Sequence, residues 1–121
     1  MLKDHFYTID TLTHQDNIIV AELQLNSDHA IFQGHFPGQP VVPGACIIQM
    51  VKEVLSEALK AAYTLKKADN LKFIAPIDPR ITDDLQLKLT YKTVDTDLQV
   101  TGGLAANGVV CFKMHALFIN A

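Results

Sequence analysis

The amino-acid sequence predicts an α+β fold, in which an antiparallel sheet is wrapped around one long central helix. Three observations support this prediction. Residues 44–62 carry apolar side chains at helical spacing, the segments on both sides alternate as strands do, and short turns join most neighbouring strands. With 121 residues, of which 49% are apolar, the chain is long enough to bury a core. We expect a single domain that spans residues 1–121.

Two strands are predicted before the helix. Residues 18–25 read IIVAELQL, and their alternation of apolar and polar side chains is typical of a half-buried strand. Residues 5–12 show a weaker strand pattern, and the polar turn 13–17 joins them to the strand at residues 18–25. The next loop contains Asp28 and His29, which we expect to act as turn and capping residues.

A long amphipathic helix is predicted over residues 44–62. Its apolar positions recur every three or four residues, and they are Ile47, Ile48, Val51, Val54, Leu55, Ala58 and Leu59. The charged positions lie mostly on the other side, and they are Lys52, Glu53, Glu57 and Lys60. Cys46, Gln49 and their neighbours make the first turns less polar than those of a surface helix. We therefore expect other elements to cover at least the N-terminal half.

Four strands are predicted after the helix. They cover residues 70–75, 85–94, 98–105 and 109–119. The second of them reads LQLKLTYKTV, a strict alternation that indicates a strand with one buried face. The pair Asn107-Gly108 is typical of a two-residue hairpin turn, so the last two strands should lie side by side. A curved sheet around one helix is the hot-dog fold, and this order of elements agrees with it.

Charge and composition exclude several kinds of function. The net charge of −3 and the lack of a basic stripe argue against nucleic-acid binding. No apolar run approaches the ~20 residues that a membrane-spanning helix needs. The polar N-terminus lacks the apolar stretch of a signal peptide, so we expect a cytoplasmic protein.

Four basic residues lie beside or within residues 69–77, and they are Lys66, Lys67, Lys72 and Arg80. We interpret this group as an ordinary solvated face. The alternative is a docking site for an anionic partner that carries a tethered substrate.

The cysteines and most of the histidines have no motif around them. Cys46 and Cys111 are too few for a disulfide framework, so we expect two buried free thiols. No Cys/His cluster suggests zinc, and no metal or cofactor is expected. We expect His5, His14 and His115 to be structural or exposed.

The most informative segment is residues 34–44, which read GHFPGQPVVPG. It places His35 among three glycines and three prolines, which together favour a rigid loop of special shape. Pro43 and Gly44 suit the start of a helix, where backbone N–H groups are free. An imidazole beside a helix N-terminus is a plausible catalytic arrangement, and a purely structural histidine is the alternative.

Residues 32–44 resemble the active-site stretch of the 3-hydroxyacyl-[acyl-carrier-protein] dehydratases of fatty acid synthesis. Residues 71–77, which read LKFIAPI, and the closing hairpin 98–118 are similar to the same family. The resemblance implies a hot-dog homodimer, or an assembly of dimers, that removes water from 3-hydroxyacyl thioesters. It implies acyl carrier protein or coenzyme A as the carrier of the acyl chain, and no cofactor.

The chain departs from the family at one position. In the family, the histidine acts with a Glu or Asp that lies fourteen residues later, on the central helix of the partner subunit. Here the fourteenth residue after His35 is Gln49, and an amide cannot donate a proton as a carboxylic acid does. Glu53 lies one helical turn further, ~5–6 Å away. We expect Glu53 to be a solvated or salt-bridged residue, with a displaced catalytic role as the alternative.

The resemblance also implies roles for individual residues. His35 is the base, a backbone N–H near Gly44 polarises the thioester carbonyl, and Gln49 stands in for the acid as a hydrogen-bonding group. The residues expected to bind the substrate are Phe36, Pro37, Val41, Pro43 and Phe73. Two other functions stay open: an acyl-thioester-binding protein that has lost dehydration, and an acyl thioesterase.

Overall fold

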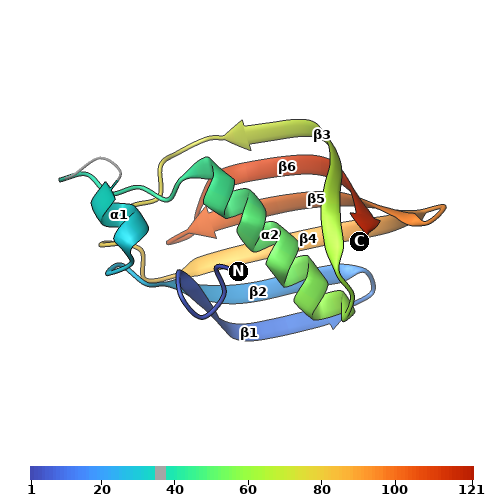
Figure 1. Ribbon diagram of the computed structural model, residues 1–121, viewed down its shortest axis with the longest axis horizontal. Coiled ribbons are helices and arrows are strands. Elements are labelled where there is room, and N and C mark those ends of the chain that lie inside the picture. Colours follow the sequence, from blue (N-terminus) through green and yellow to red (C-terminus); the bar gives the residue numbers. More distant parts are fainter. Residues whose placement is uncertain (35–37) are drawn as a thin grey trace.

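The computed structural model describes residues 1–34 and 38–121, and Figure 1 shows the arrangement of their elements. The strands are β1 (Tyr7–Gln15), β2 (Ile18–Leu25), β3 (Tyr63–Phe73), β4 (Leu85–Val94), β5 (Asp97–Ala106) and β6 (Val109–Asn120). The helices are the short α1 (Ala30–Gly34) and the long α2 (Gly44–Leu59). The predicted order of two strands, a long helix and four strands is confirmed.

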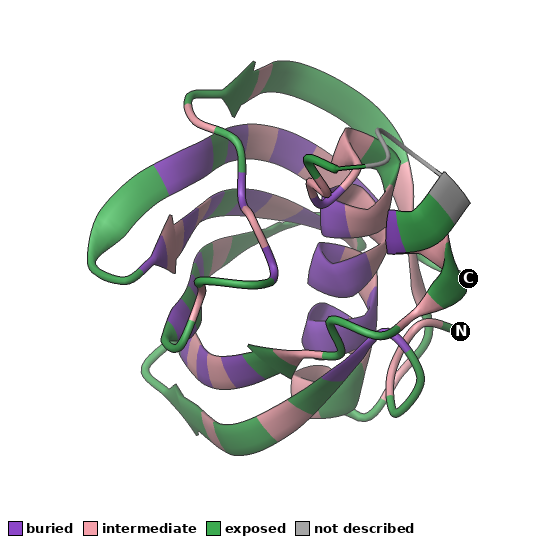
Figure 2. Cartoon of the chain, turned by 90° about the vertical axis from the view of Figure 1, so that its left-hand side faces the viewer, coloured by how far each residue is buried: buried purple, intermediate pink, exposed green. Residues whose placement is uncertain are grey.

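The six strands form one sheet with the order β1-β2-β4-β5-β6-β3. All neighbouring strands are antiparallel. Figure 2 shows how the sheet curves around α2, with the buried positions of strands and helix facing each other. This is the hot-dog fold that the sequence predicts. It leaves β1 and β3 as the two edges of the sheet.

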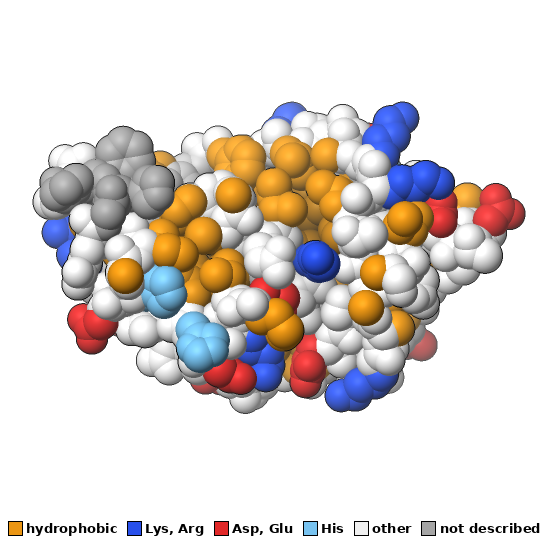
Figure 3. Space-filling model, in the orientation of Figure 1, with side chains coloured by type: hydrophobic (Ala, Val, Ile, Leu, Met, Phe, Trp, Pro, Cys, Tyr) orange, Lys and Arg blue, Asp and Glu red, His pale blue; other side chains and the backbone are white. Residues whose placement is uncertain are grey.

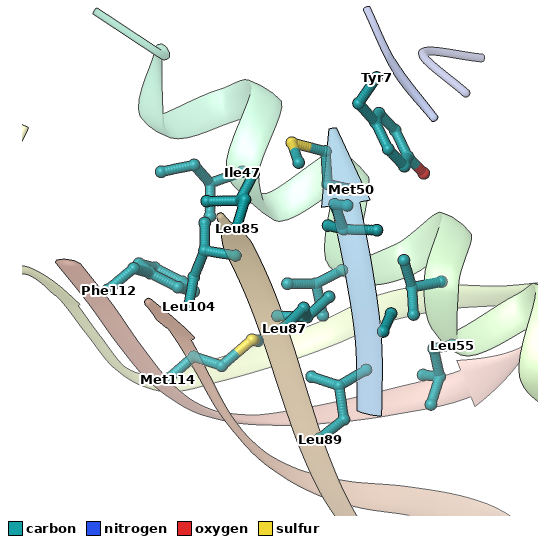
Figure 4. Packing of buried hydrophobic residues seen from close by; sticks show 14 of the residues in the cluster. Tyr7, Ile47, Met50, Leu55, Leu85, Leu87, Leu89, Leu104, Phe112 and Met114 are labelled. Carbon is teal, nitrogen blue, oxygen red and sulfur yellow. The ribbon is translucent and has the colours of Figure 1, made fainter. Parts of the chain in front are cut away.

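The core lies between α2 and the concave face of the sheet (Figure 4). Leu85, Leu87 and Leu89 alternate with polar residues along β4, so they point toward the helix together. From the helix, Met50 and Leu55 are almost fully buried against them. The alternation and the helical period therefore meet in one continuous apolar layer.

Both ends of α2 follow from its local sequence. Pro43 precedes the helix in an extended conformation, with φ −63° and ψ 144°. Lys60 ends it with a left-handed backbone at φ 57°, and its N–H donates to the carbonyl oxygen of Ser56. The helix is therefore shorter than the predicted span of residues 44–62.

Three further elements differ from the prediction. β1 extends to Gln15 because Asp16 and Asn17 alone make the turn, both at positive φ. β3 begins at Tyr63, seven residues before the predicted start, because an edge strand with exposed polar residues lacks the alternation of a half-buried strand. α1 has five residues, too few to show a helical period.

Candidate functional site

The site predicted from the sequence begins in the loop before α2. His35, Phe36 and Pro37 lie outside the described residues. After them the chain is tied to the loop that follows β3, because the N–H of Val42 donates to the carbonyl oxygen of Ile77 at 2.9 Å. This bond sets where the loop meets the helix.

An apolar groove of about 380 Å³ lies at the start of α2. Val41 and Gly44 line it from the loop and the helix, and Phe73 lines it from the end of β3. A side chain at position 44 would bring its Cβ within 2.9 Å of two carbon atoms of the Phe73 ring, so only glycine permits this approach. The structure therefore brings together three of the predicted site residues. Pro43 caps the same helix but is not among the groove residues.

The N-terminus of α2 offers a hydrogen-bond donor beside this groove. Pro43 has no N–H, and no side chain caps the helix. Among the described residues, no acceptor receives the N–H of Gly44. The first turn of a helix carries partial positive charge, so this N–H is suited to a carbonyl oxygen that gains negative charge.

Gln49 and Glu53 form a hydrogen-bonded pair one helical turn along α2. The side-chain Nε2 of Gln49 donates to Oε2 of Glu53 at 2.7 Å. Glu53 is only 5% exposed, and it also accepts bonds from the N–H of Leu2 at 2.9 Å, the N–H of Lys3 at 2.8 Å and the hydroxyl of Tyr7 at 3.0 Å. The expectation that Glu53 is solvated or salt-bridged is therefore wrong, since the N-terminal segment covers it.

These hydrogen bonds decide the charge of Glu53. Burial alone raises the pKa of this carboxyl, but the four donors together outweigh burial and hold the pKa below its ordinary value of 4.5. Burial and the nearby Glu53 charge raise the pKa of Tyr7, which stays a protonated donor. Glu53 is thus a buried carboxylate with a full set of donors.

Gln49 lies in a different cavity from Gly44. The cavity beside Gln49 has a volume of about 450 Å³, and its lining includes Lys52, Glu53 and Ser56. None of its residues lines the groove at Gly44 and Phe73. Within one chain, the structure does not bring Gln49 together with the other described site residues.

The remaining polar candidates have structural partners. Lys66 pairs with Asp97 at 3.0 Å, Lys67 with Asp69 at 3.5 Å and Arg80 with Asp78 at 2.8 Å. Three of the four basic residues are thus paired on the surface, which fits the solvated face better than a free docking site.

Three histidines that lack a motif also have local partners. The Nδ1 of His29 accepts the N–H of Ile31 at 3.1 Å, which confirms its capping role. Nε2 of His14 lies 2.6 Å from the hydroxyl of Tyr91. Nδ1 of His115 lies 3.2 Å from the hydroxyl of Thr101.

Both cysteines are free, as predicted, but only Cys111 is buried, while Cys46 is partly exposed. Burial raises the pKa of the Cys46 thiol, which disfavours the thiolate. In the described part of the chain, no three His, Cys, Asp or Glu side chains group closely enough to hold a metal ion. No helix among the described residues is both long and apolar enough to span a membrane.

The family model and the curated relatives that match this chain are both described as dehydratases. The chain matches the ApeI-like family, described as ApeI dehydratase, over residues 11–111. It is 34% identical to the 3-hydroxyacyl-[acyl-carrier-protein] dehydratase FabZ of Enterococcus faecalis over 79 residues, which cover 59% of this chain and 55% of that protein. It is also 34% identical to the FabZ of Thermomicrobium roseum over 95 residues, which cover 69% of this chain and 64% of that protein. The chain thus spans between about half and two thirds of the length of these two curated relatives.

The comparison with solved structures shows the fold. The structure superimposes on the dehydratase heterocomplex ApeI:P from Xenorhabdus doucetiae with a TM-score of 0.75. The identity is 20%, and the match covers 93% of this chain and 96% of that chain. This likeness shows the hot-dog fold. The family match, which spans the loop before α2, the helix and β2 to β5, shows that the chain belongs to the ApeI-like dehydratase family.

Proposed function

We propose that this protein removes water from 3-hydroxyacyl thioesters carried on acyl carrier protein, in fatty acid synthesis or a related acyl-chain pathway. The observation that carries the proposal is the uncapped N-terminus of α2 beside an apolar groove, which the motif GHFPG precedes in the sequence. A thioester carbonyl needs such a donor, and an acyl chain needs such a groove. The two FabZ relatives, whose names state this reaction, support the choice of substrate.

In the proposed reaction, His35 takes a proton from C2 of the substrate. The N–H of Gly44 stabilises the negative charge that develops on the thioester oxygen. The electron pair of the C2–H bond forms the C2–C3 double bond, and the C3–O bond breaks. Because Gln49 has no acidic proton, the imidazolium formed at His35 returns its proton to the departing hydroxyl, which leaves as water. Gln49 holds that hydroxyl by a hydrogen bond.

The proposed site needs two chains. Gln49 and Gly44 line different cavities of one chain, so a second copy is required to bring a Gln49 side chain to the groove. Figure 3 shows hydrophobic side chains gathered between α2 and β3. Phe73 and Ile74 at the end of β3 are each 53% exposed, and β3 is a sheet edge that another strand can pair with. We propose a homodimer formed through this region, in a soluble cytoplasmic protein.

The test of the reaction follows the acyl group on its carrier. The native protein is incubated with a 3-hydroxyacyl-[acyl carrier protein], and the carrier is weighed by mass spectrometry. Dehydration predicts that the carrier loses the mass of one water. Release of the free carrier thiol would instead show a thioesterase, and an unchanged carrier would contradict the proposal. The same assay with 3-hydroxyacyl-coenzyme A decides between the two carriers.

A second candidate function is acyl-thioester binding without dehydration, and Gln49 is the observation that favours it. An amide at this position removes the acid of the related enzymes, and loss of a general acid typically slows a reaction on the order of 10²–10⁴-fold. This function predicts an unchanged carrier in the assay together with measurable affinity of the native protein for it. A native protein that turns over many equivalents excludes it.

The two-chain site has its own test. His35→Ala and Gln49→Ala chains are expected to be weakly active alone. When they are mixed and allowed to exchange subunits, each mixed dimer has one site with both native residues, so about one quarter of native activity should return. Activity that stays at the mean of the two variants would contradict a site shared between copies. A chain that stays monomeric in light scattering would indicate a different partner chain, since the Xenorhabdus doucetiae structure is a heterocomplex.

A further inference from the structure

Glu53 is a buried charge that the proposed reaction does not use. Among the described residues it is the only buried charged side chain. Burying a carboxylate is costly unless hydrogen bonds replace its water, and here four donors do so. One of those donors is the side chain of Gln49, the residue that stands at the position of the family's acid.

The charge of Glu53 fixes which way the Gln49 amide faces. An ionised carboxylate only accepts hydrogen bonds, so the group 2.7 Å from Oε2 of Glu53 has to be the Nε2 of Gln49. The reverse orientation would place the Oε1 of Gln49 against a negative oxygen. The Oε1 of Gln49 is therefore held at the other end of the amide, away from Glu53.

Glu53 is itself held from two other elements. The N–H groups of Leu2 and Lys3 bind it from the N-terminal segment, and the hydroxyl of Tyr7 binds it from β1. The charged groups nearby are Lys3, whose ammonium pairs with Asp4 at 3.1 Å, and the acidic Asp4 and Glu57; Lys52 and Glu57 line the same cavity as Gln49. Three hydrogen bonds besides the one from Gln49 hold the Glu53 carboxylate in place, so this carboxylate can fix the orientation of the Gln49 amide.

We propose that Glu53 is a positioning residue, which fixes the Gln49 amide so that its Oε1 accepts the hydrogen of the substrate's 3-hydroxyl group. This inference rests on the proposed function, in which Gln49 contacts that hydroxyl. It also defines a substrate class, because an acceptor at this place requires a free O–H on C3. A 3-methoxyacyl or 3-oxoacyl thioester has no hydrogen to donate there and should bind more weakly.

The pair also predicts what a carboxylate at position 49 does. Gln49→Glu places two carboxyl groups at hydrogen-bond distance, and such groups share one proton because both cannot stay charged. The double variant Gln49→Glu/Glu53→Gln restores one charge and one amide in the reverse order. We therefore expect the double variant to be more active than Gln49→Glu alone.

The test compares Glu53→Gln with Glu57→Gln, which removes the same charge from an exposed position one turn further along α2. In Glu53→Gln the side-chain amide of Gln49 can rotate and exchange the positions of its Nε2 and Oε1. We therefore expect kcat to fall about tenfold, with a smaller change in KM. Glu57→Gln should keep both constants. The side-chain amide of Gln49, assigned in nitrogen–proton NMR spectra by its loss in Gln49→Ala, should show one strongly shifted proton in the native protein and in Glu57→Gln. That shift should disappear in Glu53→Gln.

Equal kinetics in Glu53→Gln and Glu57→Gln, or an unshifted Gln49 amide in the native protein, would overturn the inference. If Glu53→Gln does not fold, the native amide signal and the order of Gln49→Glu and the double variant still decide it. A native protein without dehydratase activity but with the shifted amide would mean that the proposed function is wrong while the pair is real. The proposed role of Glu53 in positioning Gln49 toward the substrate would then be wrong as well.

Discussion

At the scale of single residues, Glu53 shows where local sequence stops being informative. Its neighbour Glu57 is exposed, and the period of α2 gives no reason for a buried carboxylate. The partners that bury it are Leu2, Lys3 and Tyr7, which lie 46 to 51 residues away along the chain. No motif joins these positions, so only the folded chain reveals the network.

The stability of the protein at acidic pH should depend on the charge of Glu53. Its pKa is lowered in the folded chain, so its contribution to stability is fully present above the ordinary value of 4.5 and is lost as pH falls toward the folded value. We expect the melting temperature of the native protein to exceed that of Glu53→Gln at neutral pH. The difference should shrink between about pH 5 and pH 3. A difference that stays constant over this range would show that the charge of Glu53 adds no stability.

Gly44 should matter for the groove more than for stability. Gly44→Ala puts a methyl group 2.9 Å from the Phe73 ring, and this ring can swing outward because it is about half exposed. We expect a loss of stability below about 1 kcal/mol, since the ring is not in the core. Displacing the ring should raise KM for long acyl chains severalfold.

Gly103→Ala is the matched control for Gly44→Ala, because its new methyl group would be no closer than 3.7 Å to its nearest neighbour. It should leave KM unchanged. Equal KM values for Gly44→Ala and the native protein would show that Phe73 takes no part in binding the acyl chain.

At the scale of elements, prediction succeeded where one face is buried and failed at the edges. β4 and β6 alternate between core and solvent, so their bounds were predicted within one residue. β3 lies at the edge of the sheet and is exposed over most of its length, so its polar first half looked like a loop. The hairpin between β5 and β6 was predicted from Asn107-Gly108 because both residues tolerate the positive φ values of 51° and 81° found there.

Asn107 should stabilise more than its own turn. Its Oδ1 accepts the N–H groups of Asp83 and Asp84 at 3.0 Å, and its Nδ2 donates to the carbonyl oxygen of Ile81 at 2.8 Å. We expect Asn107→Ala to lower the free energy of unfolding by about 2 kcal/mol, from the lost bonds and the left-handed backbone. Asn107→Gly should lose less, since glycine keeps the backbone conformation. Urea denaturation measures both, and two values equal to the native one would refute the tie between the turn and this loop.

At the scale of the whole molecule, the sequence predicted the architecture, while the roles of its candidate site residues stay predictions. Val41, Gly44 and Phe73 line one groove, because the loop, α2 and the end of β3 meet there. His35 lies outside the described residues, and Gln49 lines another cavity. A residue supplied by a second copy cannot be placed by the packing of one chain, and this is why the proposed dimer matters to the reaction.

The most direct measurement is the initial rate at which the native protein and His35→Ala convert a 3-hydroxyacyl-[acyl carrier protein] to its enoyl product. The proposed mechanism predicts turnover by the native protein and a loss on the order of 10²–10⁴-fold in His35→Ala. His14→Ala, which removes a histidine that contacts Tyr91, should keep the native rate. Equal rates for the native protein and His35→Ala would contradict dehydration by this site.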